Sequence, residues 1–219
     1  MGEEIDLMKN YPKSKRNLED RAKMRTEEDR RIARKFGIDF FDGDRRYGYG
    51  GYQYHPRFWK PVVPTFQEFY SLTPESKILD VGCGKGFMLY DFTRLIPGIK
   101  VAGIDISEYA ISNAMEKVKP FLKVGNAKEL PFEDNSFDLV ISITTVHNLK
   151  REDCKSALLE IERVSSKDKF ITVDAYHGKK EKERMDKWNL TALTYMAVNK
   201  WKMFFDETGY RGDYYWFIP

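Results

Sequence analysis

The stretch that decides the fold of this chain is residues 78–86, which read ILDVGCGKG. A short apolar run of this kind is typical of a buried parallel strand, and the residues that follow the glycines have a helical pattern. Glycines at such a turn let backbone amides approach a ligand closely. The next apolar run, residues 101–105, ends at Asp105, about 20 residues on, where an acid commonly binds ribose hydroxyls. This spacing predicts a pocket for a small molecule that contains adenosine.

The spacing of the glycines argues against a dinucleotide ligand. The fingerprint G-x-G-x-x-G fails, because its last position would be Phe87 or Leu89. Asp80, just before the glycines, would repel a pyrophosphate and attract an ammonium group. S-adenosylmethionine has adenosine, an ammonium and a sulfonium but no phosphate, so it fits these residues better than NAD does.

At this point the sequence resembles the class I S-adenosylmethionine-dependent methyltransferases. Their first motif, an apolar run followed by D/E-x-G-x-G-x-G, matches residues 78–86. Residues 125–140, GNAKELPFEDNSFDLV, resemble the family's G-D-A-x-x-L-P-F and S-F-D-L-V motifs, and residues 146–149, VHNL, resemble its L-H-H-L motif. The resemblance covers residues 75–175 with its parts in order. It implies S-adenosylmethionine as cofactor and S-adenosylhomocysteine as product.

The pattern of elements predicts an α/β fold. Strands are expected over 77–81, 100–104, 121–124, 137–143, 169–174 and 213–218, and helices over 86–96, 107–118, 152–164 and 199–209. Alternating strands and helices favour right-handed crossovers, and so a Rossmann-like, doubly wound, mostly parallel sheet with helices on both faces. Ligands bind at the carboxyl ends of such strands. The antiparallel strand that usually closes the family's sheet is expected to be absent or to lie elsewhere.

Two domains are predicted: an N-terminal part over residues 1–74 and a methyltransferase domain over residues 75–219. The first part begins with a highly charged region of mixed sign, for which a helix over residues 13–36 is expected. This region is interpreted as a solvated arm, with an oligomerisation helix or a lid helix as the alternatives. A homo-oligomer is therefore among the expectations. A further helix over residues 58–72 should lead into the core.

Residues 47–57, YGYGGYQYHPR, interleave tyrosines with glycines; we call them the tyrosine segment. Glycines make the backbone mobile, and tyrosines offer large contact areas with a polar tip. The segment is predicted to be a lid over the cofactor pocket, and the alternative is a connector packed on the domain surface. The residues assigned to this lid are Tyr47, Tyr49, Tyr52, Tyr54 and Arg57.

The resemblance implies roles for single residues of the cofactor site. Asp80 is expected to meet the methionine ammonium, and Asp105 should accept hydrogen bonds from both ribose hydroxyls. Asn126 stands where the family often has an acid, so its contact with the adenine amino group would be uncharged. The other residues expected to line the cofactor are Gly82, Gly84, Gly86, Ile106, Ala127, Ile143 and Thr144.

Catalysis needs mainly alignment, because the sulfonium is already a good leaving group. A hydroxyl acceptor also needs a base, and histidine titrates near neutral pH. His147, His177 and His55 are the three candidates, and the alternative for His147 is a structural role at the start of the next helix. None of them has metal-ligand spacing with another His, Cys or acid, so no metal is expected.

Composition narrows the class of partner. The chain has 37 Lys and Arg against 34 Asp and Glu, a net charge of +3, which gives no strong argument for nucleic acid, so a nucleic-acid partner is not expected. Two cysteines, no apolar run of about 18 residues and no signal peptide favour a reduced, cytoplasmic protein without a membrane span.

The predicted acceptor is a small molecule, methylated on oxygen or nitrogen. Arg45, Arg46, Arg57 and the tyrosines would suit an anionic or sugar-like acceptor. Residues 141–144, ISIT, lack the N/D-P-P-Y/F signature of adenine and glutamine-amide methylation. A methyltransferase for RNA or protein, a nucleotide-binding oxidoreductase and an inactive fold remain as alternatives.

Overall fold

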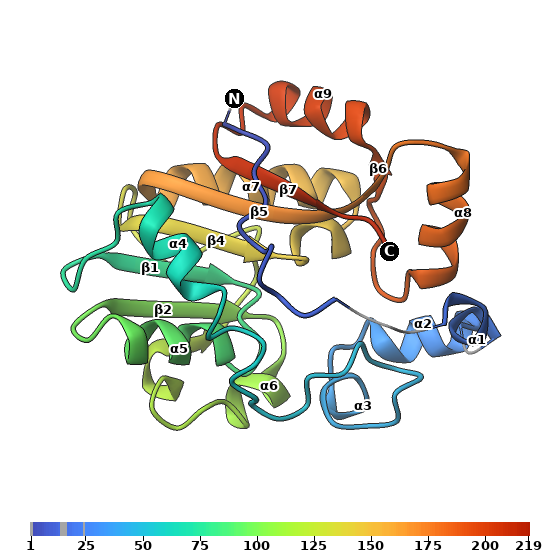
Figure 1. Ribbon diagram of the computed structural model, residues 1–219, viewed down its shortest axis with the longest axis horizontal. Coiled ribbons are helices and arrows are strands. Elements are labelled where there is room, and N and C mark those ends of the chain that lie inside the picture. Colours follow the sequence, from blue (N-terminus) through green and yellow to red (C-terminus); the bar gives the residue numbers. More distant parts are fainter. Residues whose placement is uncertain (1, 14–16, 24) are drawn as a thin grey trace.

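A parallel β-sheet forms the centre of the molecule (Figure 1). The computed structural model describes residues 2–13, 17–23 and 25–219. Within them the strands are β1 (Lys77–Val81), β2 (Lys100–Asp105), β3 (Leu122–Val124), β4 (Phe137–Ile143), β5 (Ser165–Tyr176), β6 (Met196–Ala197) and β7 (Asp213–Phe217). Their order is β3-β2-β1-β4-β5, with both β6 and β7 beside β5, and every pair of neighbours runs parallel. The predicted doubly wound sheet is confirmed.

Helices cover both faces of the sheet. One core contains side chains of α4 (Val63–Phe69) and α5 (Phe87–Leu95), which pack with Ile78, Ile141 and Phe170. The other core contains side chains of α7 (Arg151–Val164) and α9 (Val198–Thr208), which pack with Leu79, Val140 and Val173. Strand residues alternate between the two cores, because successive side chains of a strand point to opposite faces.

Several shorter helices complete the fold. They are α1 (Leu18–Lys23), α2 (Glu27–Ala33), α3 (Ile38–Phe41), α6 (Glu108–Ser112) and α8 (Lys179–Trp188), with the 3₁₀ turns η1 (Lys119–Phe121) and η2 (Val146–Asn148). Helices α1, α2 and α3 lie at the end of the sheet to which the strands point, next to α6 and α8 (Figure 1). In the described part of the chain, no helix is both long enough and apolar enough to span a bilayer.

Some predicted element boundaries were wrong, for identifiable reasons. The helix expected over 13–36 is broken where Thr26 caps α2: its hydroxyl accepts from the Asp29 amide while the Asp29 carboxylate accepts from the Thr26 amide. Residues 14–16 and 24 of that prediction lie outside the described residues. The helix expected over 107–118 stops at Ser112, and a few residues later the Met115 amide donates to the Lys85 carbonyl at 3.0 Å.

Other predicted elements have different lengths, and several elements, among them the short α3 and β6, were not predicted. The helix expected over 58–72 forms only over Val63–Phe69, with a proline in its first turn. Strand β5 begins at Ser165, earlier than its most apolar residues. Helix α8 was not predicted, because its sequence KKEKERMDKW has almost no apolar stripe.

The edge of the sheet at β7 is covered by the N-terminal residues of the chain. The Ile5 amide donates to the Tyr214 carbonyl and the Tyr214 amide donates to the Glu3 carbonyl, both at 3.0 Å. Leu7 then enters the core beside α4. β7 itself runs parallel to β5, so a short parallel pairing stands where the family usually places its antiparallel strand. Covered edges of this kind prevent pairing with other chains.

We expect Ile5→Pro to destabilise this edge, because proline cannot donate the hydrogen bond to Tyr214. The loss should be about 1–3 kcal/mol of unfolding free energy, with more self-association through the freed edge of β7. Denaturant unfolding and size-exclusion chromatography measure both effects. Ile5→Ala is the matched control, because it shortens the same side chain but keeps the amide that donates to Tyr214. Equal stability of the two variants would contradict the assigned pairing.

Candidate functional site

The glycine loop between β1 and α5 has a backbone that only glycine adopts easily. Gly82, Gly84 and Gly86 have φ values of 90°, 53° and 73°, all in the left-handed region. A side chain at Gly82 would overlap Thr145, and one at Gly86 would press on Val118 and Leu122. The loop is therefore held tightly between β1 and the end of β4.

Two buried carboxylates flank this loop. Asp80 is 5% exposed, and burial together with the nearby charge of Asp105 raises its pKa to about 8. Asp105 accepts hydrogen bonds from the amides of Gly84 (2.7 Å) and Ser107 (2.9 Å), although burial still raises its pKa. Asp80 accepts no hydrogen bond from any described residue. A cation placed beside Asp80 would relieve the cost of burying this charge.

The other residues predicted to bind the cofactor lie at the same edge of the sheet. Ile106 follows β2 and is 55% exposed, so an apolar face is open for contact there. Asn126 and Ala127 follow β3, and the Asn126 side-chain oxygen already accepts from the Lys128 amide at 3.0 Å. Ile143 ends β4, and Thr144 after it has a left-handed φ of 50°. The structure thus brings together the ends of β1 to β4.

The three candidate histidines do not come together. His147 lies buried in η2, where its Nδ1 accepts from the Asp174 amide at 2.9 Å, and burial lowers its pKa to about 3. His177 is exposed beyond β5, and its Nδ1 lies 3.0 Å from the Glu181 carboxylate. His55 belongs to the tyrosine segment, and its Nδ1 accepts from the Arg57 amide. Among the described residues no cluster of metal-ligating side chains occurs.

Residues 25–57, which we call the cap, lie on the glycine loop. Lys85, between two of its glycines, donates to both carboxylate oxygens of Asp42 (2.6 and 2.7 Å) and to the Tyr52 carbonyl (2.9 Å). The Tyr109 hydroxyl also donates to Asp42. The Ser107 hydroxyl donates to the carbonyl of Phe36 in the cap. These bonds fasten the cap to the glycine loop after β1, to the residues after β2 and to α6.

The tyrosines of the cap differ in their surroundings. The Tyr54 hydroxyl donates to Asp91 on α5 at 2.7 Å. Tyr49 stacks on Trp188 of α8, and its hydroxyl accepts from the Leu190 amide at 2.9 Å. Tyr52 is bound through its carbonyl, as described above. The two remaining residues of the predicted lid contact neighbours in the sequence: Arg46 lies over the Tyr47 ring, and the exposed Arg57 lies over Phe58.

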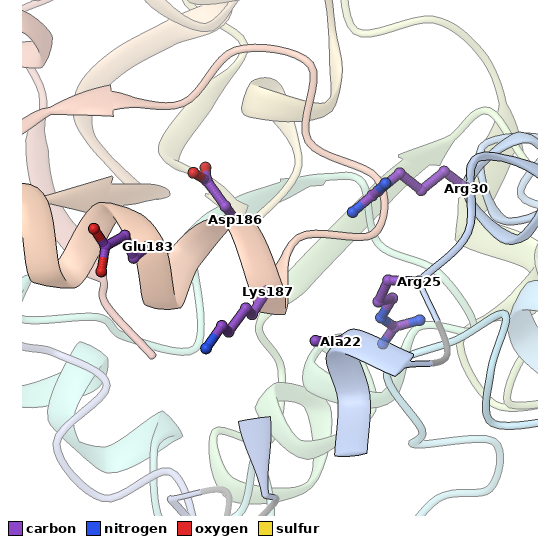
Figure 2. Close-up of a pocket in the computed structure, with 6 residues that line it drawn as sticks. All are labelled: Ala22, Arg25, Arg30, Glu183, Asp186 and Lys187. Atoms are coloured by element: carbon purple, nitrogen blue, oxygen red, sulfur yellow. The ribbon is translucent and has the colours of Figure 1, made fainter. Parts of the chain in front are cut away.

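Two clefts lie beside the cap rather than at the glycine loop. The first, of about 410 Å³, separates α1 and α2 from α8 and is lined by Ala22, Arg25, Arg30, Glu183, Asp186 and Lys187 (Figure 2). The second, of about 360 Å³, lies between α2 and residues 189–195. Side chains of both signs line each cleft, and neither includes Asp80, Asp105 or a glycine of the loop.

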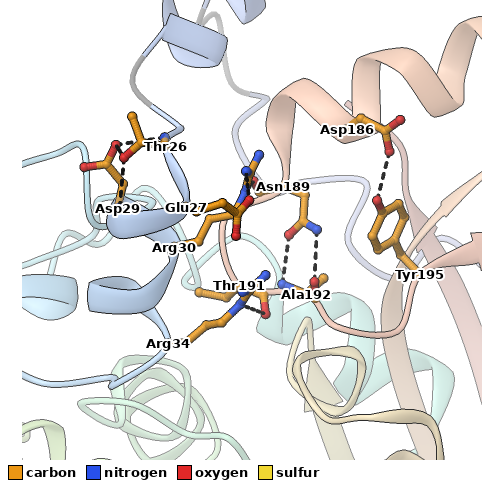
Figure 3. Close-up of polar contacts among 10 residues, drawn as sticks. All are labelled: Thr26, Glu27, Asp29, Arg30, Arg34, Asp186, Asn189, Thr191, Ala192 and Tyr195. Atoms are coloured by element: carbon orange, nitrogen blue, oxygen red, sulfur yellow. Dashed lines mark hydrogen bonds and ion pairs between the residues drawn. The ribbon is translucent and has the colours of Figure 1, made fainter.

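The segment 189–195, which joins α8 to β6 and which we call the α8–β6 turn, is fixed on both sides (Figure 3). The Asn189 side chain exchanges hydrogen bonds with the backbone of Ala192, and the Tyr195 hydroxyl donates to Asp186. Arg34, which follows α2, donates to the Thr191 carbonyl. On the inner side, the Leu193 and Thr194 amides donate to the His147 carbonyl. The turn therefore joins the cap to the end of β4.

Sequence reasoning missed one group at this edge, Asp174. It lies near the carboxyl end of β5 and is 4% exposed, and burial raises its pKa to about 7. The available signal was the acid in the apolar run ITVDAY, which repeats the pattern of Asp80 in ILDV.

The order of the strands, the glycine loop and the acids at the strand ends define the Rossmann-like class of α/β proteins. Residues 79–173 match the family described as "Methyltransferase domain". These residues therefore form a methyltransferase domain, and the solved structures that align with the chain share its Rossmann-like fold.

Two named relatives match about half to two thirds of the chain. The tRNA (carboxymethyluridine(34)-5-O)-methyltransferase of Arabidopsis thaliana is 34% identical over 143 residues, which are 64% of this chain and 33% of that protein. The demethylmenaquinone methyltransferase of Symbiobacterium thermophilum is 37% identical over 111 residues, 47% of this chain and 43% of that protein. This chain therefore spans less than half the length of these two relatives.

Two solved structures have a fold similar to that of this chain. Phosphoethanolamine N-methyltransferase 2 of Haemonchus contortus, in complex with S-adenosyl-L-methionine, aligns with a TM-score of 0.59 and 22% identity, over 81% of this chain and 44% of that one. The YcgJ protein of Bacillus aligns with a TM-score of 0.55 and 18% identity, over 67% of this chain and 66% of that one.

We expect Lys85→Met to loosen the cap without unfolding the sheet, because it keeps the apolar stem but removes the bonds to Asp42 and Tyr52. Hydrogen bonds to charged groups contribute about 1.5–3 kcal/mol, so the amides of residues 38–54 should exchange with solvent at least tenfold faster. Hydrogen-exchange mass spectrometry measures this. Lys128→Met, which removes the ion pair with Asp153, is the control. Unchanged exchange in the Lys85 variant would show that other contacts hold the cap.

Proposed function

We propose that this protein transfers the methyl group of S-adenosylmethionine to an oxygen or nitrogen atom of a small molecule. The observation that carries the proposal is the pair of buried acids, Asp80 and Asp105, on either side of the glycine loop in a methyltransferase domain. A buried carboxylate without a hydrogen-bond donor favours a cationic ligand. The methionine ammonium of the cofactor is such a cation.

The residues of the site fit this cofactor. Asp80 would bind the ammonium, which would bring the pKa of its carboxyl down again. Asp105 uses one lone pair of each oxygen for a backbone amide, and the remaining lone pairs can accept from the ribose hydroxyls. Ile106 offers its exposed side chain to adenine. When bound, the cofactor supplies a methyl group on a positively charged sulfur.

The remaining assignments follow from position. Gly82, Gly84 and Gly86 would let the backbone pass beneath the methionine and ribose. The residues proposed to border adenine and the methyl group are Asn126, Ala127, Ile143 and Thr144. We place the boundary between the N-terminal part and the methyltransferase domain between residues 74 and 75.

The cap is proposed to act as the lid of the site. Its support is the set of hydrogen bonds from Lys85, Ser107 and Tyr109 to the cap, because Lys85 and Ser107 belong to the loops that would hold the cofactor and Tyr109 begins the helix that follows Ser107. Tyr49 and Tyr54 reach inward to α8 and α5, whereas Tyr47 and Arg57 contact sequence neighbours. Tyr49 is therefore the member of the tyrosine segment that we assign most directly to the acceptor side.

A small acceptor is favoured over a macromolecule by charge. The net charge of +3 and the mixed signs in both clefts provide no basic surface of the kind that nucleic acids need. Two relatives are named as methyltransferases of demethylmenaquinone and of a sterol, which are small molecules. The second candidate acceptor is tRNA, because the relative named as a tRNA methyltransferase aligns with 64% of this chain.

The first experiment is calorimetric titration with S-adenosylmethionine, S-adenosylhomocysteine and NAD. Binding of the first two without NAD supports the proposal, and binding of NAD alone would overturn it. Release of S-adenosylhomocysteine in the presence of small alcohols, phenols, hydroxy acids and amines, and separately of tRNA, then distinguishes the two classes of acceptor.

Asp105→Ala should weaken S-adenosylmethionine binding by about 1.5–3 kcal/mol, the range for hydrogen bonds to a charged group. The same titration measures the change in Kd. Asp153→Ala, which removes a carboxylate on the surface of α7, should leave Kd unchanged. A Kd that is the same in both variants would remove Asp105 from the cofactor site.

A further inference from the structure

Asp174 has a fixed backbone and a carboxylate without hydrogen bonds. Its amide donates to His147 Nδ1 at 2.9 Å, and its carbonyl accepts from Trp201 Nε1 at 3.0 Å. The side chain is 4% exposed, and no described residue donates a hydrogen bond to its oxygens. The nearest ring nitrogen, His147 Nε2, is 3.7 Å from Oδ1. Buried carboxyl groups with a purely structural role are normally hydrogen-bonded.

His147 is held in one protonation state beside it. Because Nδ1 accepts a backbone hydrogen bond, the proton of the neutral ring lies on Nε2, which faces Asp174. Burial lowers the pKa of His147 to about 3, so the ring stays neutral near pH 7. At 3.7 Å the Nε2–H group makes no hydrogen bond to the carboxylate, and the only basic nitrogen of the ring is already occupied. Of these two groups, only Asp174 has lone pairs available to a ligand.

The sheet register places Asp174 on the same face as the acids of the cofactor site. Ile141 pairs with Asp80 on one side and with Phe170 on the other, so these three residues share a face. Asp174 lies four residues beyond Phe170 and keeps that face, because strand side chains alternate. Asp105 shares it as well, two residues beyond Gly103, the partner of Asp80. Asp174 is thus one strand further from the cofactor loop than Ile143.

The groups that face Asp174 come from the cap and from η2. Tyr49 of the cap is close enough for the charge of Asp174 to add to burial in raising the pKa of its hydroxyl. That hydroxyl accepts from the Leu190 amide in the α8–β6 turn. The guanidinium groups of Arg21 and Arg25 lie near the Tyr49 ring. His147 is the titratable group on the side of β4. The cap and the α8–β6 turn therefore cover the carboxyl end of β5.

We propose that Asp174 accepts the proton of the acceptor's O–H or N–H group during methyl transfer. This inference rests on the proposed function. The acceptor atom forms a bond to the methyl carbon while the methyl–sulfur bond breaks and its electron pair goes to sulfur. The O–H or N–H bond breaks, its electron pair stays on the acceptor atom, and its proton passes to Asp174.

The acidity of the group suits this role. Burial raises the pKa of Asp174 to about 7, close to the value at which a general base is most effective at neutral pH. The ionised form does the work, so the rate constant should rise as pH increases through about 7 and then level off. Burial of this ionised carboxylate without a hydrogen-bond partner lowers the free energy of unfolding of the protein.

Asp174→Asn should lower kcat by roughly 10²–10⁴-fold, the usual contribution of a general base, and leave the Kd for S-adenosylmethionine unchanged. The assay uses radiolabelled S-adenosylmethionine with the acceptor that reacts best in the alcohol and amine panel. The wild-type rate should fall below about pH 7, whereas the residual rate of the variant should be flat. Asp168→Asn, on the same strand, is the matched control. Asp174→Ser replaces the Asn variant if that variant does not fold.

A second readout does not need turnover. Because the folded-state pKa of about 7 lies above the unfolded value of 3.8, the folded protein binds the extra proton within this window and loses stability as pH rises through it. Asn cannot ionise, so the Tm of the variant minus that of the wild type should increase from pH 5 to pH 8. Asp80 is present in both proteins and its contribution cancels. A structural hydrogen-bonding role would instead lower Tm equally at both pH values.

The outcomes separate the two proposals. Failure of both proteins to bind S-adenosylmethionine would overturn the proposed function and this inference with it. Normal binding with an unchanged kcat in Asp174→Asn would overturn this inference alone, as would a Tm difference that is the same at both pH values. A lower kcat, a flat pH profile and a Tm difference that grows with pH would support it.

Discussion

Burial of carboxylates at the carboxyl ends of parallel strands is the constraint on which the rest of this structure depends. A parallel sheet brings the ends of β1, β2 and β5 to one edge, and Asp80, Asp105 and Asp174 all point from the same face there. Only Asp105 is compensated by backbone amides. The apolar cores on both faces must provide the stability that these acids remove, and strand side chains such as Leu79, Ile141 and Val173 are fully buried in them.

The part of the fold that local signals encode was predictable from the sequence. β1, the glycine loop and β4 each combine an apolar run with an abrupt change of residue type, and the structure places them within a residue or two of their predicted bounds. Contacts between distant segments were not predictable. The bond from Met115 to Lys85 accompanies the early end of α6, and Glu3 and Ile5 pair with Tyr214, more than 200 residues away in the sequence. Asp174 was missed because it is covered by the cap and the α8–β6 turn, which are distant from it in the sequence or not part of its strand.

The cap and the end of β5 are linked through a small number of residues. Tyr49 contacts Trp188 of α8 and accepts from Leu190, and the turn that follows Leu190 donates twice to the His147 carbonyl. On the other side, Lys85 holds Asp42 and Tyr52 of the same cap. One segment of chain therefore touches both the loop assigned to the cofactor and the strand end assigned to the acceptor, so a movement of the cap would alter both environments together.

The pairing of residues 3–5 with β7 has a kinetic consequence for the cap. The chain is anchored at the sheet edge by Ile5 and Leu7 and returns to the core at α4, so the cap lies within a loop closed at both ends. Because the closure entropy of such a loop grows only slowly with its length, an opened cap stays at an effective concentration on the order of millimolar relative to Lys85. Reclosure of the cap is then a first-order event that does not depend on protein concentration. Each opening therefore exposes the carboxyl ends of the strands only briefly.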